Sequence, residues 1–438
     1  MSNDVGKKLN LVKEILKAIH RGEDVNELKR RFTDVLSQIS PFEIPLIEQE
    51  LIKEGVSIDE ILKLCDLHVA LFRDYLQSRE IKDLPKGHPL DLLIRENEYI
   101  LKQAEVLTLY ASALLKAQNS EEVRNYLNIV STVLQELRKI RTHYRKVQML
   151  IFPYLERRGI IAVPRVLWGR EDQVILKLRE LSGLLGKALQ TLDGVTVKEL
   201  ANKALELSKD VSELVFRENK ILFPAVWVLF SEGEWATVAE LGDDIGWLVS
   251  VESRWVPKER PIMPYELNTS VSQEQLSKLP KEFADVVSKG IQPDNYQVKR
   301  EGDLDLGTGF LSVDEVKAIF KSLPIEITYA NTDGRVKFYS ESFLHRGFVR
   351  TKTIVGRRFE YCHPPRLEAM VKNIAKEVMD GKVEFREFWT RIGDRIIRVL
   401  ITPVKDGDGK VLGVTEVVED LTDVVNNVDE VKKKIMVL

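Results

Sequence analysis

Apolar residues recur every three or four positions through most of residues 1–250, which is the spacing of a helix face that packs against a core. Shorter helical patterns occupy residues 1–82 and predict a small helical domain. Beyond them, short polar or glycine-containing stretches separate four long segments, so the pattern predicts an up-and-down four-helix bundle within residues 83–255. The four segments cover approximately residues 89–119, 120–157, 167–190 and 196–230.

From about residue 311 the pattern changes to the alternation of apolar and polar residues that is typical of strands. Two such segments flank an Asn-Thr-Asp-Gly turn, a helix follows and ends at Gly381, and three further alternating segments complete the chain. Residues 256–310 are rich in Pro, Gly and polar residues and are interpreted as a linker, and residues 429–438 as a tail. The predicted fold class is multidomain, with an all-α N-terminal part and an α+β domain with an antiparallel sheet over residues 311–428.

The composition narrows the classes of protein to which the chain can belong. Of the 438 residues, 44% are hydrophobic and 30% are charged, as in folded globular proteins. The net charge of −3 provides no basic field for nucleic acid, and no apolar run is long enough for a transmembrane segment. The two cysteines, Cys65 and Cys362, lie far apart, and the N-terminus lacks a signal-peptide pattern, so we expect a cytoplasmic protein. The basic run from Arg138 to Lys146 is interpreted as the solvated face of a helix.

The second and fourth long segments contain two copies of one pattern. The stretch "HYRKVQMLIFPYLERRG" begins at His143, and "LVFRENKILFPAVWVLF" begins at Leu214. When the shared Phe-Pro pairs are aligned, His143 falls on Leu214 and Val147 falls on Glu218. The first copy therefore has a His without a Glu four residues later, and the second copy has the Glu without the His.

Several phrases, among them "GHPLDLLIRENEYI", "HYRKVQMLIFPYLERRGI", "VLWGREDQ" and "ENKILFP", resemble a prokaryotic three-part family. Its members join a helical domain of unknown function, a hemerythrin-like (HHE cation-binding) bundle and a C-terminal PAS sensor domain. The phrases "IVGRRFEYCHPPRLEAMVKNI" and "GDGKVLGVTEVVEDLT" are similar to PAS domains. The resemblance implies a sensor domain, and a bundle that in the family holds two irons between four helices.

The ligand pattern that this resemblance implies is incomplete in the chain. At two of the six ligand positions stand Val147 and Leu214, which cannot bind a metal. Glu171 stands where the family has a His, and it is still an oxygen donor. An intact di-iron site is therefore not expected. The three positions that keep the family's residue type are His88, His143 and Glu218.

Two interpretations of the bundle centre remain open. One is a single iron or zinc ion held by the two histidines and the two glutamates. The other is a metal-free bundle, in which Val147 and Leu214 fill the former metal cavity while His143 and Glu218 form a buried hydrogen-bonded pair. We favour the metal-free interpretation, because branched apolar side chains are what core packing selects once a metal is lost.

Two further pairs combine a cysteine with a histidine. Cys65 and His68 lie three residues apart on one helix face, which suits a buried structural pair or, alternatively, a redox or metal-binding pair. Cys362 and His363 lie before the helix that flanks the ligand cavity in PAS domains. They are candidates for contacting haem or another small ligand, and the alternative is that the two prolines after them simply start the helix.

No nucleophile–base arrangement, phosphate loop or DNA-binding motif is recognisable in the sequence, so we expect a protein that is not an enzyme. We predict a cytoplasmic sensor or regulatory protein whose PAS domain binds a small ligand or mediates protein interaction. Its signal would pass to a partner protein, and the PAS domain is a candidate homodimer interface. The alternatives are metal binding by the bundle for oxygen or redox sensing or iron handling, and a non-catalytic structural scaffold.

Overall fold

The long helical segments belong to the first of two units, which spans residues 1–296, and the strands belong to the second, which spans residues 297–438. The computed structural model describes residues 83–267 and 292–436, apart from 342–349, together with a few single positions at 14–27, 81 and 269. Within this part of the chain, none of the helices combines the length and the apolar character needed to cross a membrane.

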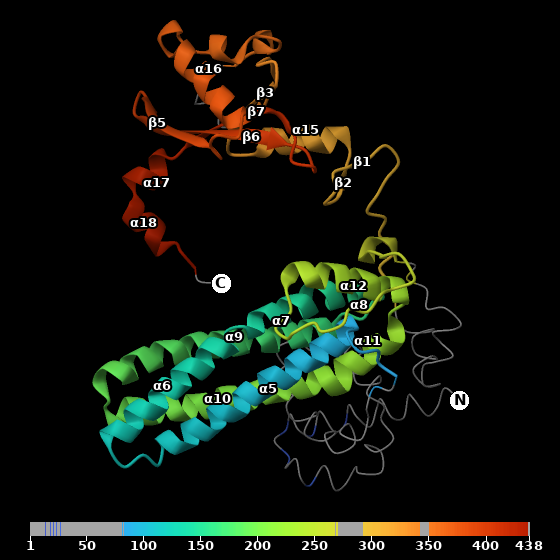
Figure 1. Ribbon diagram of the computed structural model, residues 1–438, viewed down its shortest axis with the longest axis vertical. Helices are drawn as coiled ribbons and strands as arrows, with labels where there is room; N and C mark the ends of the chain where they lie inside the picture. The colour runs from blue at the N-terminus through green and yellow to red at the C-terminus, as the bar shows by residue number, and fades with distance from the viewer. Residues whose placement is uncertain are drawn as a thin grey trace. The chain divides into compact units, whose positions relative to one another are not determined.

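Four helical rods form the bundle, as the sequence predicts. Each rod contacts two neighbours, with α5 between α6 and α10, and α9 between the same two helices on the other side. Figure 1 shows the four rods running alongside one another. The rods are α5 (Pro89–Leu114), α6 (Ser120–Leu137) with α7 (Ile140–Lys146) and α8 (Phe152–Arg157), α9 (Ala162–Thr191), and α10 (Gly194–Arg217) with α11 (Phe223–Leu229); α12 (Glu232–Ile245) packs against α5 and α7.

A π-helical turn precedes the Phe-Pro pair in both copies of the repeat: η1 (Val147–Ile151) and η2 (Glu218–Leu222). The N–H of Phe152 bonds to the carbonyl of Val147, five residues back, and Phe223 bonds to Glu218 in the same way. Proline has no N–H, and its ring collides with the carbonyl four residues before it. The wider π turn relieves that collision, and it begins at the position where the family's glutamate belongs.

The second predicted helix is interrupted in the structure. At Arg138 and Lys139 the hydrogen bonds shorten from four-residue to three-residue spacing, because the N–H of Lys139 bonds to Glu136 and that of Thr142 bonds to Lys139. This tighter turn separates α6 from α7. The same region corrects our interpretation of the basic run, since Lys146 at its end is buried, with 1% of its side chain exposed, rather than solvated.

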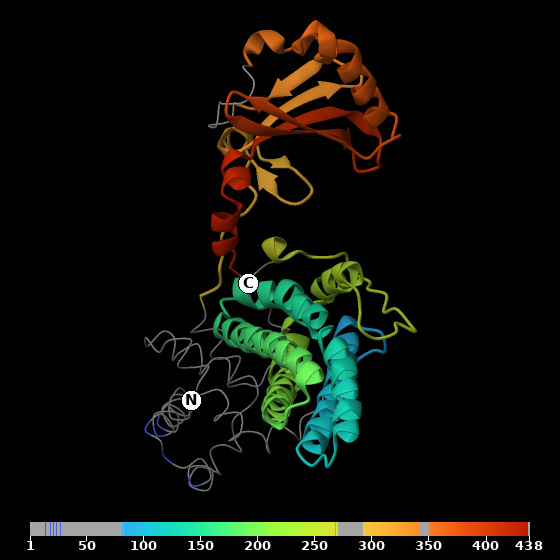
Figure 2. The same cartoon turned by 90° about the vertical axis from the view of Figure 1, so that its left-hand side faces the viewer.

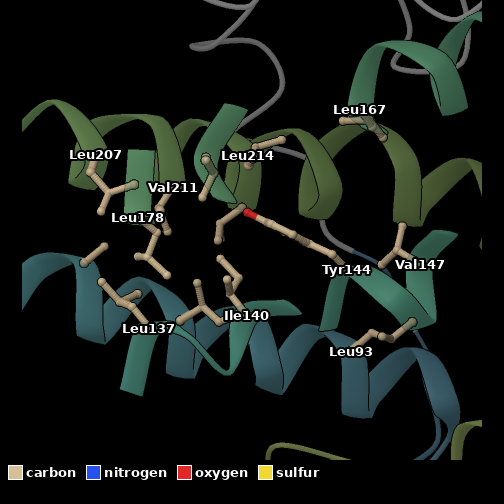
Figure 3. Packing of buried hydrophobic residues seen from close by; sticks show 14 of the residues in the cluster. Leu93, Leu137, Ile140, Tyr144, Val147, Leu167, Leu178, Leu207, Val211 and Leu214 are labelled. Atoms are coloured by element: carbon tan, nitrogen blue, oxygen red, sulfur yellow. The ribbon is translucent and has the colours of Figure 1, made fainter. Parts of the chain in front are cut away.

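The core of the bundle is apolar where the family's ligands are missing. Val147 is fully buried and Leu214 is 3% exposed, and both belong to one continuous apolar cluster. Figure 3 shows Leu214 and Val147 among the packed side chains, with the hydroxyl end of Tyr144 directed towards Leu214. Both positions therefore contribute to packing in the interior.

The second unit is built on a five-stranded antiparallel sheet with strand order β4-β3-β7-β6-β5, which confirms the predicted α+β class. Helix α16 (Pro365–Met379) packs against β6 and β7 through Val371, Ile374 and Val378. Figure 2 shows the strands side by side with α16 over one face. The strands are β3 (Glu326–Asn331), β4 (Val336–Tyr339), β5 (Arg386–Ile392), β6 (Arg395–Lys405) and β7 (Val411–Asp420).

One helix of this unit was not predicted. Helix α15 (Val313–Ser322) begins at Ser312, whose side chain accepts the N–H of Glu315 while the Glu315 side chain accepts the N–H of Ser312. The Ser-x-x-Glu spacing of this capping box is a helix-start signal that the sequence itself contains. The remaining short elements are η3 (Pro264–Glu266), β1 (Leu304–Asp305), β2 (Phe310–Leu311), η4 (Lys352–Ile354), η5 (Phe359–Cys362), α17 (Thr422–Asn426) and α18 (Val428–Lys433).

Candidate functional site in the helical bundle

His143 lies at the centre of a buried polar cluster. Its Nδ1 lies 2.7 Å from Glu96 Oε2, and its Nε2 lies 2.8 Å from Glu218 Oε2. All three side chains are buried, with at most 1% of each exposed. The structure therefore joins two of the predicted ligands, His143 and Glu218, and adds Glu96 from α5. Both ring nitrogens of His143 face carboxylate oxygens.

Lys146, one turn after His143, brings a second positive charge to the cluster. Its Nζ lies 3.1 Å from Glu96 Oε1 and donates a hydrogen bond to the carbonyl of Gly246 at 2.6 Å. The ammonium group also lies 5.0 Å from the centre of the Trp247 ring, within range of a cation–π contact. Glu96 Oε1 additionally accepts the N–H of Leu248 at 2.7 Å. The cluster thus pairs two acids with two bases.

The electrostatics of the cluster favour a charged His143. Burial by itself lowers the pKa of His143, but the charges and hydrogen bonds of Glu218 and Glu96 outweigh it and raise the pKa to about 9. Burial also raises the pKa of Glu96, and here the contacts with His143 and Lys146 prevail, so the pKa of Glu96 is lowered. At neutral pH the imidazole is therefore protonated and donates to both carboxylates.

Glu171 has a separate environment in the same interior. Its Oε2 accepts a hydrogen bond from Gln148 Nε2 at 2.6 Å, while its Oε1 is buried without a hydrogen-bond partner. Burial, and then the negative charge of Glu218, raise the pKa of Glu171 to about 8. Glu218 Oε1 and the Tyr144 hydroxyl are likewise buried without a hydrogen-bond partner. The protonated form of Glu171 prevails at neutral pH, which removes one buried negative charge.

These residues do not fit a di-iron centre. Two of the ligand positions are the apolar Val147 and Leu214, and both ring nitrogens of His143 already contact carboxylates, those of Glu96 and Glu218. Lys146 places an ammonium group against Glu96, where a metal would experience charge repulsion. Among the residues that the structure describes, no group of three or more His, Cys, Asp and Glu side chains is arranged to hold a metal ion.

His88 occupies a different position from the other predicted ligands. It precedes α5, and its Nδ1 accepts the N–H of Leu90 at 3.1 Å, so it caps the helix. Its ring contacts are with Trp227, Trp235 and Trp255, at centroid distances of 5.2, 4.9 and 4.5 Å. Burial lowers the pKa of His88 to about 4, so the imidazole is neutral. The structure thus places His88 in an aromatic enclosure.

Of the two predicted Cys-His pairs, the structure describes only Cys362 and His363. Cys65 and His68 lie outside the described residues, so their pairing stays a prediction. In the second unit, His363 Nε2 lies 3.3 Å from Glu416 Oε2, and Nδ1 lies 3.2 Å from the carbonyl of Phe359. The Cys362 thiol donates to the carbonyl of Arg358 at 3.7 Å. Both ring nitrogens of His363 thus face oxygens, and a contact of this pair with haem or another small ligand stays a prediction.

Glu416 belongs to a second buried ion-pair cluster, inside the strand unit. Arg350 donates to Glu326 at 2.6 Å, to Glu416 at 2.6 Å and to Thr328 at 2.7 Å. Burial raises the pKa of Glu416, but His363 and Arg350 outweigh it, so the pKa is lowered. Burial lowers the pKa of His363, whereas its contact with Glu416 prevails and raises it.

Three members of the bundle cluster were not predicted from the sequence: Glu96, Asn97 and Lys146. Asn97 donates to Glu218 Oε2 at 2.8 Å. One signal was available for Glu96, because it follows Leu93 by three residues and precedes Ile100 by four, and so lies on the apolar face of α5. Lys146 shares a face with His143 by the same three-residue spacing. A charged residue on a core-facing position requires a partner, and that requirement points to a cluster.

The fold and the cluster define the class of protein: a hemerythrin-like bundle joined to a PAS domain. Three family models match the chain in sequence order. A family of unknown function, DUF438, matches residues 12–78, the hemerythrin HHE cation binding domain matches residues 88–226, and a PAS domain matches residues 316–422. The three matches follow one another in the order that the sequence phrases indicate.

Two solved structures are similar to parts of the chain. One is described as the crystal structure of a C-terminal domain from Streptococcus mutans; it is 30% identical, and the match covers 29% of this chain and 98% of that one with a TM-score of 0.27. The other is the sensor region of a sensor histidine kinase, 18% identical, with 23% of this chain and 40% of that chain covered and a TM-score of 0.19. No curated protein matches the chain.

Proposed function

We propose that this protein is a cytoplasmic regulatory sensor in which the bundle is a metal-independent element and the PAS domain receives the signal as a small ligand or a protein partner. The output passes to a partner protein. The observation that carries the proposal is the position of His143, which lies between Glu96 and Glu218 at 2.7 and 2.8 Å, with Lys146 beside Glu96. Two side-chain cations neutralise the two carboxylates, so the centre needs no metal for charge balance.

This arrangement also accounts for the two substituted ligand positions. Val147 and Leu214 belong to the apolar cluster that surrounds the charged groups. An apolar surrounding strengthens the ion pairs of the cluster and keeps water from them. Such a centre holds the helices in one arrangement, and a sensor needs a defined arrangement on which a signal can act.

Metal analysis of the purified full-length chain, with its optical spectrum, tests the proposal. We expect iron and zinc well below one ion per chain, and no oxo-bridge absorption. The comparison variant is Val147→Glu with Leu214→His, which restores the two missing ligand types and is expected to take up more iron than the unaltered chain. Stoichiometric iron in the unaltered chain, lost on Glu218→Gln, would contradict the proposal.

A second candidate function is the binding of a single iron or zinc ion by the bundle. It is favoured by the three buried oxygens without hydrogen-bond partners, Glu171 Oε1, Glu218 Oε1 and the Tyr144 hydroxyl. Carboxylate oxygens are donors for both metals. The same analysis separates the two candidates, because Glu171→Gln would lower the metal content only if an ion occupies this place.

A further inference from the structure

A groove of about 460 Å³ opens at one end of the PAS sheet. Its walls come from the turn between β3 and β4, from η5, from the C-terminal half of α16 and from the first residues of β7. Neither Cys362 nor His363 lines it. The volume lies in the range of pockets that bind small molecules.

Two exposed lysines lie on one wall of the groove, which is also lined by the carboxylates of Asp333 and Asp380. Lys372 and Lys376 lie one turn apart on α16, and both line the groove. Neither forms an ion pair with any residue in the described part of the chain. Lys376 lies in the last turn of α16, where a cation also stabilises the helix end, but Lys372 lies a turn earlier, beyond the reach of that effect. An anionic group fits between them.

A carboxylate lies on another wall. Glu360 lines the groove, and only 10% of its side chain is exposed. Its ion pair with Arg358 is long, with 3.7 Å between Nη1 and Oε1, which exceeds hydrogen-bonding distance. A largely buried carboxylate whose ion pair is this long can accept a hydrogen bond from an N–H donor outside the chain.

The floor between these charged walls is apolar. It is formed by Phe359, Ala375 and Val414, which are all buried members of the core of the PAS unit, and by Met379 at the end of α16. The aromatic and thioether groups here accept an apolar body of varied shape. One wall of the groove therefore suits an anionic group, the other suits a cationic group, and an apolar surface lies between them.

We propose that this groove binds a small zwitterion with an apolar body. Lys372 and Lys376 hold its anionic group, Glu360 accepts hydrogen bonds from its ammonium group, and the body lies on Phe359 and Met379. An α-amino acid with a large apolar side chain has this chemistry. The assignment rests on the proposed function, since it names the class of ligand that the PAS domain receives.

Calorimetric titration of the full-length chain with three matched probes tests the assignment. L-phenylalanine carries both charges, 3-phenylpropionate carries the anion alone, and 2-phenylethylamine carries the cation alone, on the same phenyl body. We expect L-phenylalanine to bind with one site per chain and the other two probes to bind at least about tenfold more weakly, because each lacks one charged contact.

Three variants locate the binding. Lys372→Ala with Lys376→Ala is expected to weaken L-phenylalanine binding about tenfold or more, and Glu360→Gln to remove the preference for L-phenylalanine over 3-phenylpropionate. Lys317→Ala, on α15 outside the groove, is the control and should leave binding unchanged. The melting temperature of each variant establishes that it is folded.

Three outcomes would overturn the groove assignment: no probe binds at millimolar concentration, 3-phenylpropionate binds as tightly as L-phenylalanine, or the Lys317 control weakens binding equally. The metal content of the same samples keeps this result separate from the proposed function. Stoichiometric iron refutes the metal-independent bundle whatever the probes do, and an iron-free chain that binds no probe refutes the groove alone.

Discussion

His143 and Lys146 supply two positive charges to an interior that holds Glu96 and Glu218. An isolated charge in such a place would cost many kcal/mol, so each group depends on its partner. Removing one member therefore lowers the stability by more than the loss of its own contacts, because its partner is left as an unpaired buried charge. The cluster behaves as a unit, and single substitutions test it directly.

His143→Ala is expected to lower the free energy of unfolding by about 3–5 kcal/mol, because it leaves two buried carboxylates without their shared donor. Urea denaturation followed by circular dichroism measures this loss. His143→Ala combined with Glu218→Gln should lose less than the sum of the two single variants, since one of the stranded charges is then absent. A loss below about 1 kcal/mol for His143→Ala would contradict the coupling.

The shifted pKa values of three buried groups determine whether the stability of the bundle rises or falls with pH. The pKa of His143 is about 9 in the folded state and 6.5 in the unfolded state, so its contribution is complete below pH 6.5 and is lost as the pH rises through 9. The pKa of Glu171 is raised from 4.5 to about 8, so stability also falls as the pH rises across that interval. The pKa of His88 is lowered to about 4, so its contribution is lost as the pH falls from 6.5 through 4.

We therefore expect the free energy of unfolding of the bundle to change little between about pH 4.5 and 6.5, where the opposite contributions of His88 and Glu171 compensate, and to decline above pH 6.5. Urea titrations at intervals across this range measure it. His143→Gln should make the alkaline decline shallower and leave the part that Glu171 contributes up to about pH 8. His88→Asn, which keeps a capping side chain, should instead make the stability fall with rising pH from about 4.5 onward, because the compensating contribution is gone. A stability that rises between pH 7 and 9 would contradict the assigned charge state of His143.

Among the secondary-structure elements, the periodic ones were predictable and the irregular ones were not. The apolar period and the alternating strands gave the four rods and the five-stranded sheet. The π turns before Pro153 and Pro224 were not predicted, because an apolar stripe does not reveal one additional residue in a turn. His143 and Glu218 could be paired from the repeat. The core-facing positions of Glu96 and Lys146 were readable as well, but which partners they meet depends on how the helices pack.

The segment before α5 depends on a close backbone approach. Gly87 has a φ of +78°, and a Cβ there would lie 2.0 Å from the carbonyl oxygen of Ser253. We expect Gly87→Ala to destabilise the bundle by about 2 kcal/mol or more, through backbone strain and the displaced carbonyl. Chemical denaturation measures the change.

Gly183→Ala is the matched control, because Gly183 lies within α9 and an added Cβ meets nothing within 4 Å. This variant should stabilise the chain by about 0.5–1 kcal/mol, since alanine loses less conformational freedom in a helix. Equal changes in the free energy of unfolding for the two substitutions would show that the close approach to Ser253 does not contribute to stability.

At the scale of the whole molecule, the two units have separate interiors. The apolar cluster of the bundle and that of the PAS sheet share no residues. Each interior also contains its own charged cluster, one around His143 and the other around Arg350. The domain order could be predicted from sequence phrases, but the charged cluster of the PAS unit could not, because Arg350, Glu326 and Glu416 are distant in sequence.

We expect two unfolding transitions that respond to different variants. Arg350→Ala leaves Glu326 and Glu416 buried without their partner, so the PAS transition should lose about 3–5 kcal/mol while the transition of the bundle stays in place. His143→Ala should do the reverse. Differential scanning calorimetry separates the two transitions. Arg398→Ala removes two partly exposed ion pairs, with Glu387 and Glu419, and is the control, with a smaller expected change. A single transition shifted equally by His143→Ala and Arg350→Ala would contradict the prediction.

The enclosure of His88 has a practical consequence. Three of the six tryptophans in the chain surround this imidazole. A neutral imidazole quenches indole fluorescence weakly and a protonated one quenches it strongly, so the emission of these tryptophans reports the ionisation of one histidine. The beginning of the bundle thus carries an intrinsic optical probe, and the opening of this end can be followed in the unlabelled protein through its emission intensity and wavelength.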